Sequence, residues 1–167
     1  MVKRPVKSIG IIMITGDRGL AGGYNANLIR KAMAEAAGMA DVEKGFIAVG
    51  RKGRDYLRRR QRKINAEFIG INDIPKVAEA RGIVDLAVKL YLDETYDEIH
   101  LVYQEFVSAL TQRPLIKQLL PIPYSSEDEA SASDYLYEPE PVKVLDMLLP
   151  KYVLNKVFQA LMEAKAS

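Results

Sequence analysis

Residues 8–15, SIGIIMIT, form a continuous apolar run rich in β-branched side chains, and the hydrophobic period changes to that of a helix soon after it. A strand that is apolar on both faces is typical of the interior of a parallel sheet with helices on both sides. The helical period predicts a helix that starts after Asn25 as N-cap and ends at Gly38. This pair of elements therefore predicts a layered α/β domain.

The same alternation of strand and helix continues through the first hundred residues. We expect strands at 45–50 and 64–70, a basic helix at 51–60, and a longer helix capped by Asp73 with Pro75 in its first turn. Residues 96–110 predict a further strand, with 113–122 as its antiparallel partner. The predicted fold class is α/β: a Rossmann-like, mostly parallel sheet with flanking helices and an antiparallel hairpin.

The last third of the chain contains a polar, acidic stretch at 124–133 and then a long amphipathic segment that ends the sequence. We expect the polar stretch to be a loop. Helical spacing of apolar residues predicts a C-terminal amphipathic helix, which Pro150 should kink or restart. We expect a single domain, with an α/β globular part at 1–140 and a helical part at 141–167.

Composition excludes several classes of function. The chain has no cysteine and one histidine, so it has no disulfide and no thiolate nucleophile, and a metal site is not expected. A net charge of +2 predicts neither nucleic acid nor lipid as a partner, and no apolar run is long enough for a membrane span. We therefore expect a soluble chain without direct membrane insertion.

The glycine-rich stretch at 16–23 poses the question of nucleotide binding, because such a turn between a strand and a helix holds phosphates in many proteins. The P-loop pattern fails from every glycine, and no lysine stands where the phosphates would need it. The dinucleotide pattern fails because Arg18, Ala21 and Tyr24 occupy the place of its second glycine. Two explanations remain open: a weak anion site using Arg18, or glycines needed only for a sharp turn.

The string DRGLAGGYN at 17–25 resembles the loop that follows the first strand in the gamma subunit of F-type ATP synthases. Gly16 departs from the Ser or Thr usual in that family. The segments SALTQRPLIKQLLPI, YLYEPEP and VFQALMEAKAS resemble the same family in the same order, so the resemblance covers essentially the whole chain.

The resemblance implies a non-catalytic central-stalk rotor subunit that needs no cofactor and couples rotation of a proton-driven ring to ATP synthesis or hydrolysis. Residues 141–167 would then be the start of a truncated C-terminal shaft helix. The implied partners are the epsilon subunit, the proteolipid ring of the membrane sector and the alpha/beta catalytic ring. The implied location is the cytoplasmic face of a bacterial plasma membrane, as a peripheral part of the complex. The residues implied to contact partners are Asp17, Arg18, Gly19, Leu20, Gly22, Gly23, Asn25, Tyr135, Tyr137 and Glu138.

Other features have plainer interpretations. The basic cluster at 51–63 is expected to be a solvated helix face, with an acidic partner as the main alternative and nucleic acid as a remote one. Acidic residues at 127–134 favour a solvated loop over a metal site, and His100 favours a hydrogen-bonded structural role. The alternative function for the whole chain is a small α/β nucleotide- or phosphate-binding enzyme using the glycine-rich loop.

Overall fold

The computed structural model describes residues 5–17, 24–38, 41–72, 74–108, 112–122 and 141–166, with the side chains of the last helix described for 151–164. Nine elements follow one another along these residues. In chain order they are β1 (Ser8–Ile14), α1 (Tyr24–Ala37), β2 (Glu43–Val49), α2 (Arg51–Arg59), β3 (Ile64–Phe68), α3 (Val77–Leu92), β4 (Glu98–Phe106), β5 (Gln112–Leu120) and α5 (Pro141–Ala166).

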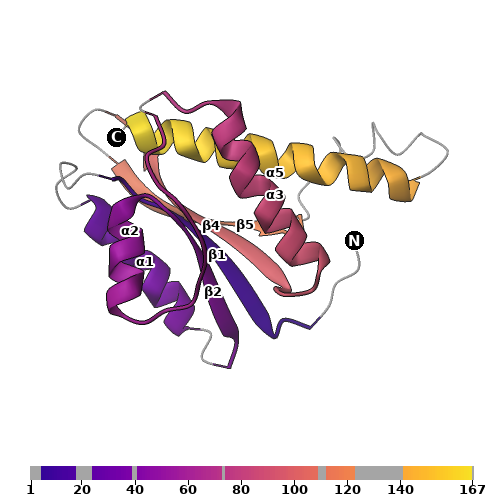
Figure 1. Ribbon diagram of the computed structural model, residues 1–167, viewed down its shortest axis with the longest axis horizontal. Coiled ribbons are helices and arrows are strands. Elements are labelled where there is room, and N and C mark those ends of the chain that lie inside the picture. The colour runs from indigo at the N-terminus through magenta and orange to yellow at the C-terminus, as the bar shows by residue number, and fades with distance from the viewer. Residues whose placement is uncertain are drawn as a thin grey trace.

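The strands form one five-stranded sheet in the order β3-β2-β1-β4-β5. Strands β1 to β4 are parallel, and β5 pairs antiparallel with β4 at the edge (Figure 1). The expected α/β fold with a mostly parallel sheet and one antiparallel hairpin is therefore confirmed. All seven residues of β1 are buried, as expected for the central strand.

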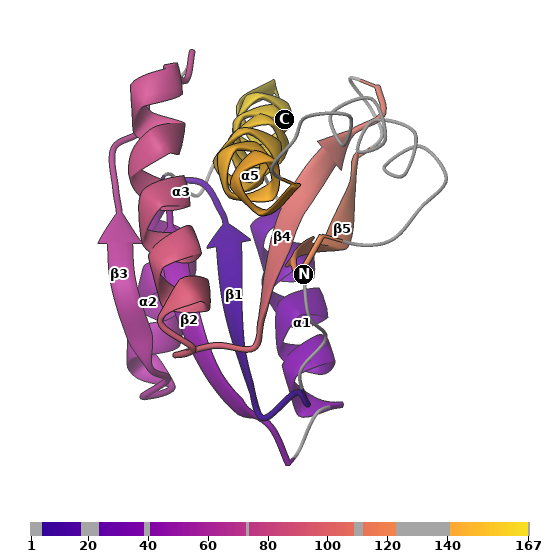
Figure 2. The same cartoon turned by 90° about the vertical axis from the view of Figure 1, so that its right-hand side faces the viewer.

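Helices cover both faces of the sheet, with α3 and α5 on one side and α1 and α2 on the other (Figure 2). Alternate residues of β1 supply the two cores, because successive side chains of a strand point to opposite faces. Ile12 and Ile14 belong to the core beneath α3 and α5, while Ile9, Ile11 and Met13 belong to the core beneath α1 and α2.

Two helix starts differ from the sequence-based expectation. Helix α1 begins at Tyr24, so Asn25 lies inside the helix and is not its N-cap. Helix α3 begins at Val77 with Lys76 at the N-cap, so Pro75 precedes the helix, and Asp73 lies outside the described residues. Glu79 explains this later start, since its carboxylate accepts the Lys76 N–H at 2.9 Å, and this backbone hydrogen bond lowers the pKa of Glu79. A cap chosen by residue type alone misses such a contact.

Helix α5 is continuous through Pro150, so of the two expected effects of this proline, a kink or a restart, the restart is wrong. A proline in a helix removes one hydrogen bond and crowds the preceding turn. The residues that follow are held by the core, where Val153, Val157, Ala160 and Leu161 are all buried. Tertiary packing of this apolar face therefore outweighs the local cost of the proline.

A close approach between strands and a tyrosine was not expected from the sequence. Gly10 and Gly45 are paired across β1 and β2, and the ring of Tyr96 lies over both of them. The Tyr96 side chain is fully buried, and its hydroxyl donates to Asn65 Oδ1 at 2.5 Å. A Cβ atom at position 45 would overlap the Tyr96 hydroxyl. The two glycines are needed because they leave the space that this ring fills.

We expect Gly45→Ala to lower the free energy of unfolding by about 2–3 kcal/mol, because the added methyl overpacks this site. Combining it with Tyr96→Phe should cost less than the sum of the two single changes, since the overlapping hydroxyl is removed. Urea denaturation of the four proteins measures this coupling. Gly82→Ala is the control: its Cβ meets only Phe68 at an ordinary 3.5 Å, so this helix substitution should stabilise by about 0.5–1 kcal/mol. Additive single effects at positions 45 and 96 would contradict the packing argument.

Candidate functional site

Most of the residues implied to contact partners lie outside the described residues. These are Arg18, Gly19, Leu20, Gly22, Gly23, Tyr135, Tyr137 and Glu138. Asn25 lies in α1, and its side chain is outside the described set. Asp17 is the one candidate whose contacts the structure gives. The candidate site is therefore built from Asp17 and its surroundings at the carboxyl end of β1.

Thr15 joins the end of β1 to both β2 and α2. Its hydroxyl donates to the Val49 carbonyl at 3.1 Å and accepts the Gly53 N–H at 2.8 Å. Gly53 lies close above it, where a Cβ would approach Thr15 Oγ1 to 2.9 Å. Gly50 enters the helix with a φ of 92°, which favours glycine, and a side chain there would collide with the Thr15 carbonyl. Helix α2 can therefore approach β1 closely only because glycine stands at both positions.

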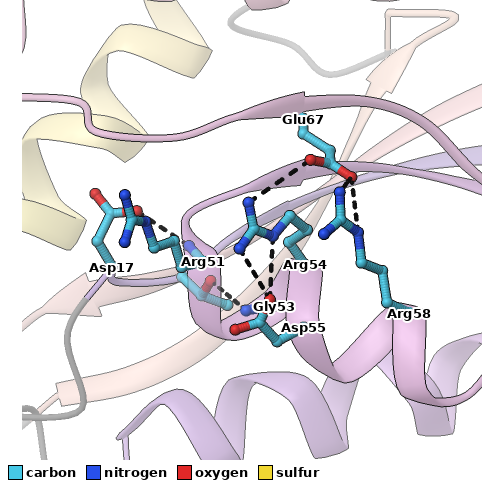
Figure 3. Close-up of polar contacts among 8 residues, drawn as sticks. Asp17, Arg51, Gly53, Arg54, Asp55, Arg58 and Glu67 are labelled. Carbon is cyan, nitrogen blue, oxygen red and sulfur yellow. Dashed lines mark hydrogen bonds and ion pairs between the residues drawn. The ribbon is translucent and has the colours of Figure 1, made fainter.

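Asp17 uses its two carboxylate oxygens to hold two other segments. Oδ1 accepts the backbone N–H of Arg51 at 3.0 Å, and Oδ2 accepts that of Gly70 at 3.1 Å. Figure 3 shows Asp17 beside Arg51 at the first turn of α2. The amides of a helix N-terminus attract anions, and at α2 a carboxylate of the protein itself occupies that place. Asp17 therefore has a structural role that the sequence did not indicate.

The space above the strand ends is small. Doubly wound sheets bind ligands in the crevice at the carboxyl ends of their strands. Here the described residues leave a hollow of about 30 Å³ at this edge, enough for about one water molecule. Its lining includes Thr15, Asp17 and Phe68, together with the α5 residues Leu161 and Ala164. Helix α5 thus forms part of the wall of this hollow.

A polar contact lies beside the apolar face of α5. Tyr103 of β4 is buried, and the carboxylate of Glu163 in α5 lies near enough to raise the pKa of its hydroxyl. The Lys117 ammonium of β5 lies 5.8 Å from the centre of the Tyr103 ring. Burial raises the pKa of Tyr103 to about 12, and the negative charges of Glu163 and Glu105 act in the same direction. The neutral phenol is therefore the form that the folded protein favours.

The basic cluster on α2 is partly neutralised by acidic neighbours. Arg58 contacts Glu67 at 2.7 Å, and Arg54 lies 3.0 Å from Asp55 and 3.8 Å from Glu67 (Figure 3). The two pairs with Glu67 join α2 to the edge strand β3. They are at least partly exposed, so each stabilises the fold by no more than about 1 kcal/mol.

His100 has the structural role that its sequence context favoured. It is buried in β4, and its Nε2 lies 2.8 Å from Glu98 Oε1. Among the described residues, no group of three His, Cys, Asp or Glu side chains is arranged to hold a metal ion. Within the same described part of the chain, no helix has the length and apolar character required for a membrane span.

The sequence did not predict a role at this site for several residues, namely Thr15, Gly50, Gly53 and the Tyr103–Glu163 pair. The signal for the glycines was present, because Gly50 stands between a strand and a helix and Gly53 lies inside a helix, where glycine is unfavourable. The Tyr103–Glu163 pair has no such signal, because it joins distant parts of the chain.

We expect Asp17→Ala to lower the free energy of unfolding by about 1–2 kcal/mol, because two backbone N–H groups lose their acceptor. Asp17→Asn should cost about half as much, since its amide keeps one acceptor oxygen. Chemical denaturation followed by circular dichroism measures both. Asp85→Ala on the exposed face of α3 is the control and should change stability by less than about 0.5 kcal/mol. Equal stabilities of Asp17→Ala and Asp85→Ala would contradict the structural role.

We expect alkaline pH to weaken the fold partly through Tyr103. An unfolded tyrosine loses its proton near pH 10, whereas folded Tyr103 keeps it up to about pH 12. The unfolded state therefore binds fewer protons in this window, and stability falls as pH rises, by about 1–2 kcal/mol for this group. Burial also raises the pKa of Tyr96, so Tyr103→Phe should reduce the slope without abolishing it. Denaturation midpoints between pH 9 and 12 test this, and identical slopes in both proteins would contradict it.

Comparison with known proteins identifies the family. A family model described as ATP synthase matches residues 1–167. The ATP synthase gamma chain of Heliobacterium modesticaldum is 45% identical over 175 residues, covering 100% of this chain and 60% of that protein. The gamma chain of Moorella thermoacetica is 47% identical over 164 residues, covering 98% of this chain and 57% of that protein. The chain thus spans about three fifths of the length of these curated relatives.

Solved structures give the same fold. A chain in the central stalk and c-ring structure of the Tetrahymena thermophila mitochondrial ATP synthase matches with a TM-score of 0.76 at 22% identity, over 99% of this chain and 73% of that one. A chain in the Euglena gracilis mitochondrial ATP synthase matches with a TM-score of 0.68 at 18% identity, over 96% of this chain and 56% of that one. Because the family model spans every residue and the curated relatives are gamma chains, this chain belongs to the gamma-chain family of ATP synthases.

Proposed function

We propose that this chain is the α/β part of a central-stalk rotor subunit, which transmits torque and performs no chemistry itself. The observation that carries the proposal is the packing of α5 on the sheet. This 26-residue helix is about 39 Å long, lies across the sheet (Figure 1), and lines the small hollow at the strand ends where an enzyme of this fold would bind its ligand. A helix that packs firmly on a rigid domain can transmit force between that domain and whatever binds the helix.

Transmission of torque requires a stiff connection between the domain and the helix. Buried apolar side chains on one face of α5, among them Val157 and Leu161, supply close packing, which resists deformation. The charged Glu163 beside the buried Tyr103 adds a polar contact at the same interface. In the proposed rotor, residues 141–167 begin the shaft helix, and the α/β part is its base.

The proposed partners are those that the resemblance to the family implies. The alpha/beta catalytic ring would be met by the shaft and by the loop after β1, where Arg18 offers charge beyond the structural Asp17. The proteolipid ring would be met by residues 134–141, with Glu138 as the candidate for a polar contact. The epsilon subunit would bind the α/β part itself. The proposed location is peripheral, at the cytoplasmic face of a bacterial plasma membrane.

The experiment that tests the proposal is complex formation with epsilon. The chain should form a one-to-one complex with the purified epsilon subunit of Moorella thermoacetica, whose gamma chain is 47% identical. A standard-sized interface predicts a dissociation constant on the order of micromolar or tighter. Size-exclusion chromatography with light scattering at tens of micromolar protein measures this. Full-length gamma chain from the same organism is the positive control.

Two separate peaks for this chain, where the full-length control co-elutes with epsilon, would contradict the proposed contact. Calorimetric titration with Mg-ATP tests the absence of chemistry on the same sample. We expect no specific heat of binding, because Asp17 already accepts the Arg51 amide at α2 and the hollow lined by α5 is small. Stoichiometric binding in the micromolar range would overturn the non-catalytic proposal and support a nucleotide-binding enzyme.

A further inference from the structure

The C-terminal end of α2 carries more positive charge than its surroundings neutralise. Residues 51–63 contain eight Lys or Arg and one acidic residue, Asp55. Among the described residues, the ion pairs of this region reach three carboxylates, those of Asp55, Glu67 and Glu43. We define the basic end of α2 as Arg59, Arg60 and Arg62. All three are exposed, and none forms an ion pair with another described residue.

The backbone beneath the basic end of α2 is fixed. Gln61 has a φ of 54°, the left-handed conformation that ends many helices. The Arg62 N–H donates to the Leu57 carbonyl at 3.0 Å, and the Gln61 N–H donates to the Arg58 carbonyl at 3.1 Å. This pair of bonds is a Schellman motif, which satisfies the last carbonyls of the helix. The Arg60 guanidinium lies 5.0 Å from the centre of the Tyr56 ring. The cations therefore project from an ordered turn.

The partial negative charge at the C-terminus of α2 does not account for this number of cations. A helix C-terminus carries the equivalent of about half a negative charge, which one nearby cation offsets. Arg58 already lies in the last turn, and three further arginines follow within four residues. The whole chain has 24 Lys and Arg against 22 Asp and Glu, so outside 51–63 acidic residues are in excess by five. The positive charge is therefore concentrated at one place.

We propose that the basic end of α2 is a docking surface for an acidic segment of a protein partner. Guanidinium groups bind carboxylates through paired N–H donors, and three of them on one turn match a short run of Asp or Glu. The basic end lies where α2 returns to the amino ends of the parallel strands, beside Glu43 and Lys63. It is thus at the opposite end of α2 from Asp17 and is independent of the loop after β1.

A membrane surface fits the basic end less well. Helices that bind at a bilayer combine cations with exposed apolar side chains that enter the lipid. In the described residues 41–72, no large hydrophobic side chain is exposed. The basic end therefore offers charge without an apolar anchor.

Nucleic acid also fits less well than a short acidic segment. Tyr56 is the one aromatic residue within 51–63, and it is already covered by Arg60, so stacking on bases is not provided. An extended polyanion would in addition approach the acidic remainder of the chain. A compact acidic segment avoids this repulsion, because it meets the positive charge alone.

The test uses the chain itself and a defined acidic probe. A fluorescently labelled glutamate peptide of about six residues, short enough to meet the basic end alone, should bind at about 50 mM salt, measured by anisotropy, and binding should weaken about tenfold at 300 mM. The triple reversal R59E/R60E/R62E should weaken binding at least about tenfold. The matched control is R81E/K89E/K151E, which changes the net charge equally at exposed cations on α3 and α5 and should weaken binding only about twofold.

Circular dichroism melting of both triple variants checks that they fold. Absence of wild-type binding, or equal loss in the two triple variants, would overturn the docking surface. Tighter binding to vesicles containing phosphatidylglycerol, or to a duplex oligonucleotide, would contradict the proposed acidic protein partner. It would indicate that the basic end of α2 binds a membrane or nucleic acid instead. The probe requires no other subunit, so its failure leaves the proposed epsilon complex untouched.

Discussion

The burial of β1 on both faces is the constraint on which the other elements depend. A strand without an exposed face requires a helical layer on each side, and parallel neighbours require crossover connections that supply those helices. Burying a large apolar side chain stabilises a fold by about 1.5–3 kcal/mol. Strand β1 buries five such side chains, which exceeds the contribution of any polar contact at its end. Thr15 and Asp17 therefore act on a framework whose layers are already determined, and they set how closely α2 approaches it.

The same framework supports the proposal that this Rossmann-like sheet serves without a nucleotide. Binding at the strand ends needs free helix amides and open space above the sheet. Asp17 accepts the Arg51 amide at α2, and Leu161 and Ala164 of α5 line the hollow beside it. A phosphate at the start of α2 would have to displace the Asp17 carboxylate. At this described part of the edge, the strand ends are therefore used for packing.

Local patterns in the sequence predicted the elements well, because hydrophobic period and glycine positions report on local structure. The continuous apolar run gave β1 and the parallel sheet, and Gly38 follows the end of α1 as expected. Contacts between distant residues were not predictable in this way. Tyr96 finds Gly10 and Gly45 only because the strand register pairs those glycines, and Tyr103 meets Glu163 across sixty residues. The loop motif predicted Asp17 as a partner contact. In the structure its carboxylate accepts backbone amides, which have no sequence signature.

The interface between α5 and the sheet combines an apolar face with a polar neighbour. Apolar packing resists both separation and rotation of the helix, because either motion would expose its buried face to water. Val153, Val157 and Leu161 lie on that face, and Glu163 is the charged neighbour of the buried Tyr103. Because Tyr103 is buried, this polar contact is screened less by salt than an exposed one. In the proposed rotor, the same buried face would resist rotation of the shaft helix relative to the α/β part.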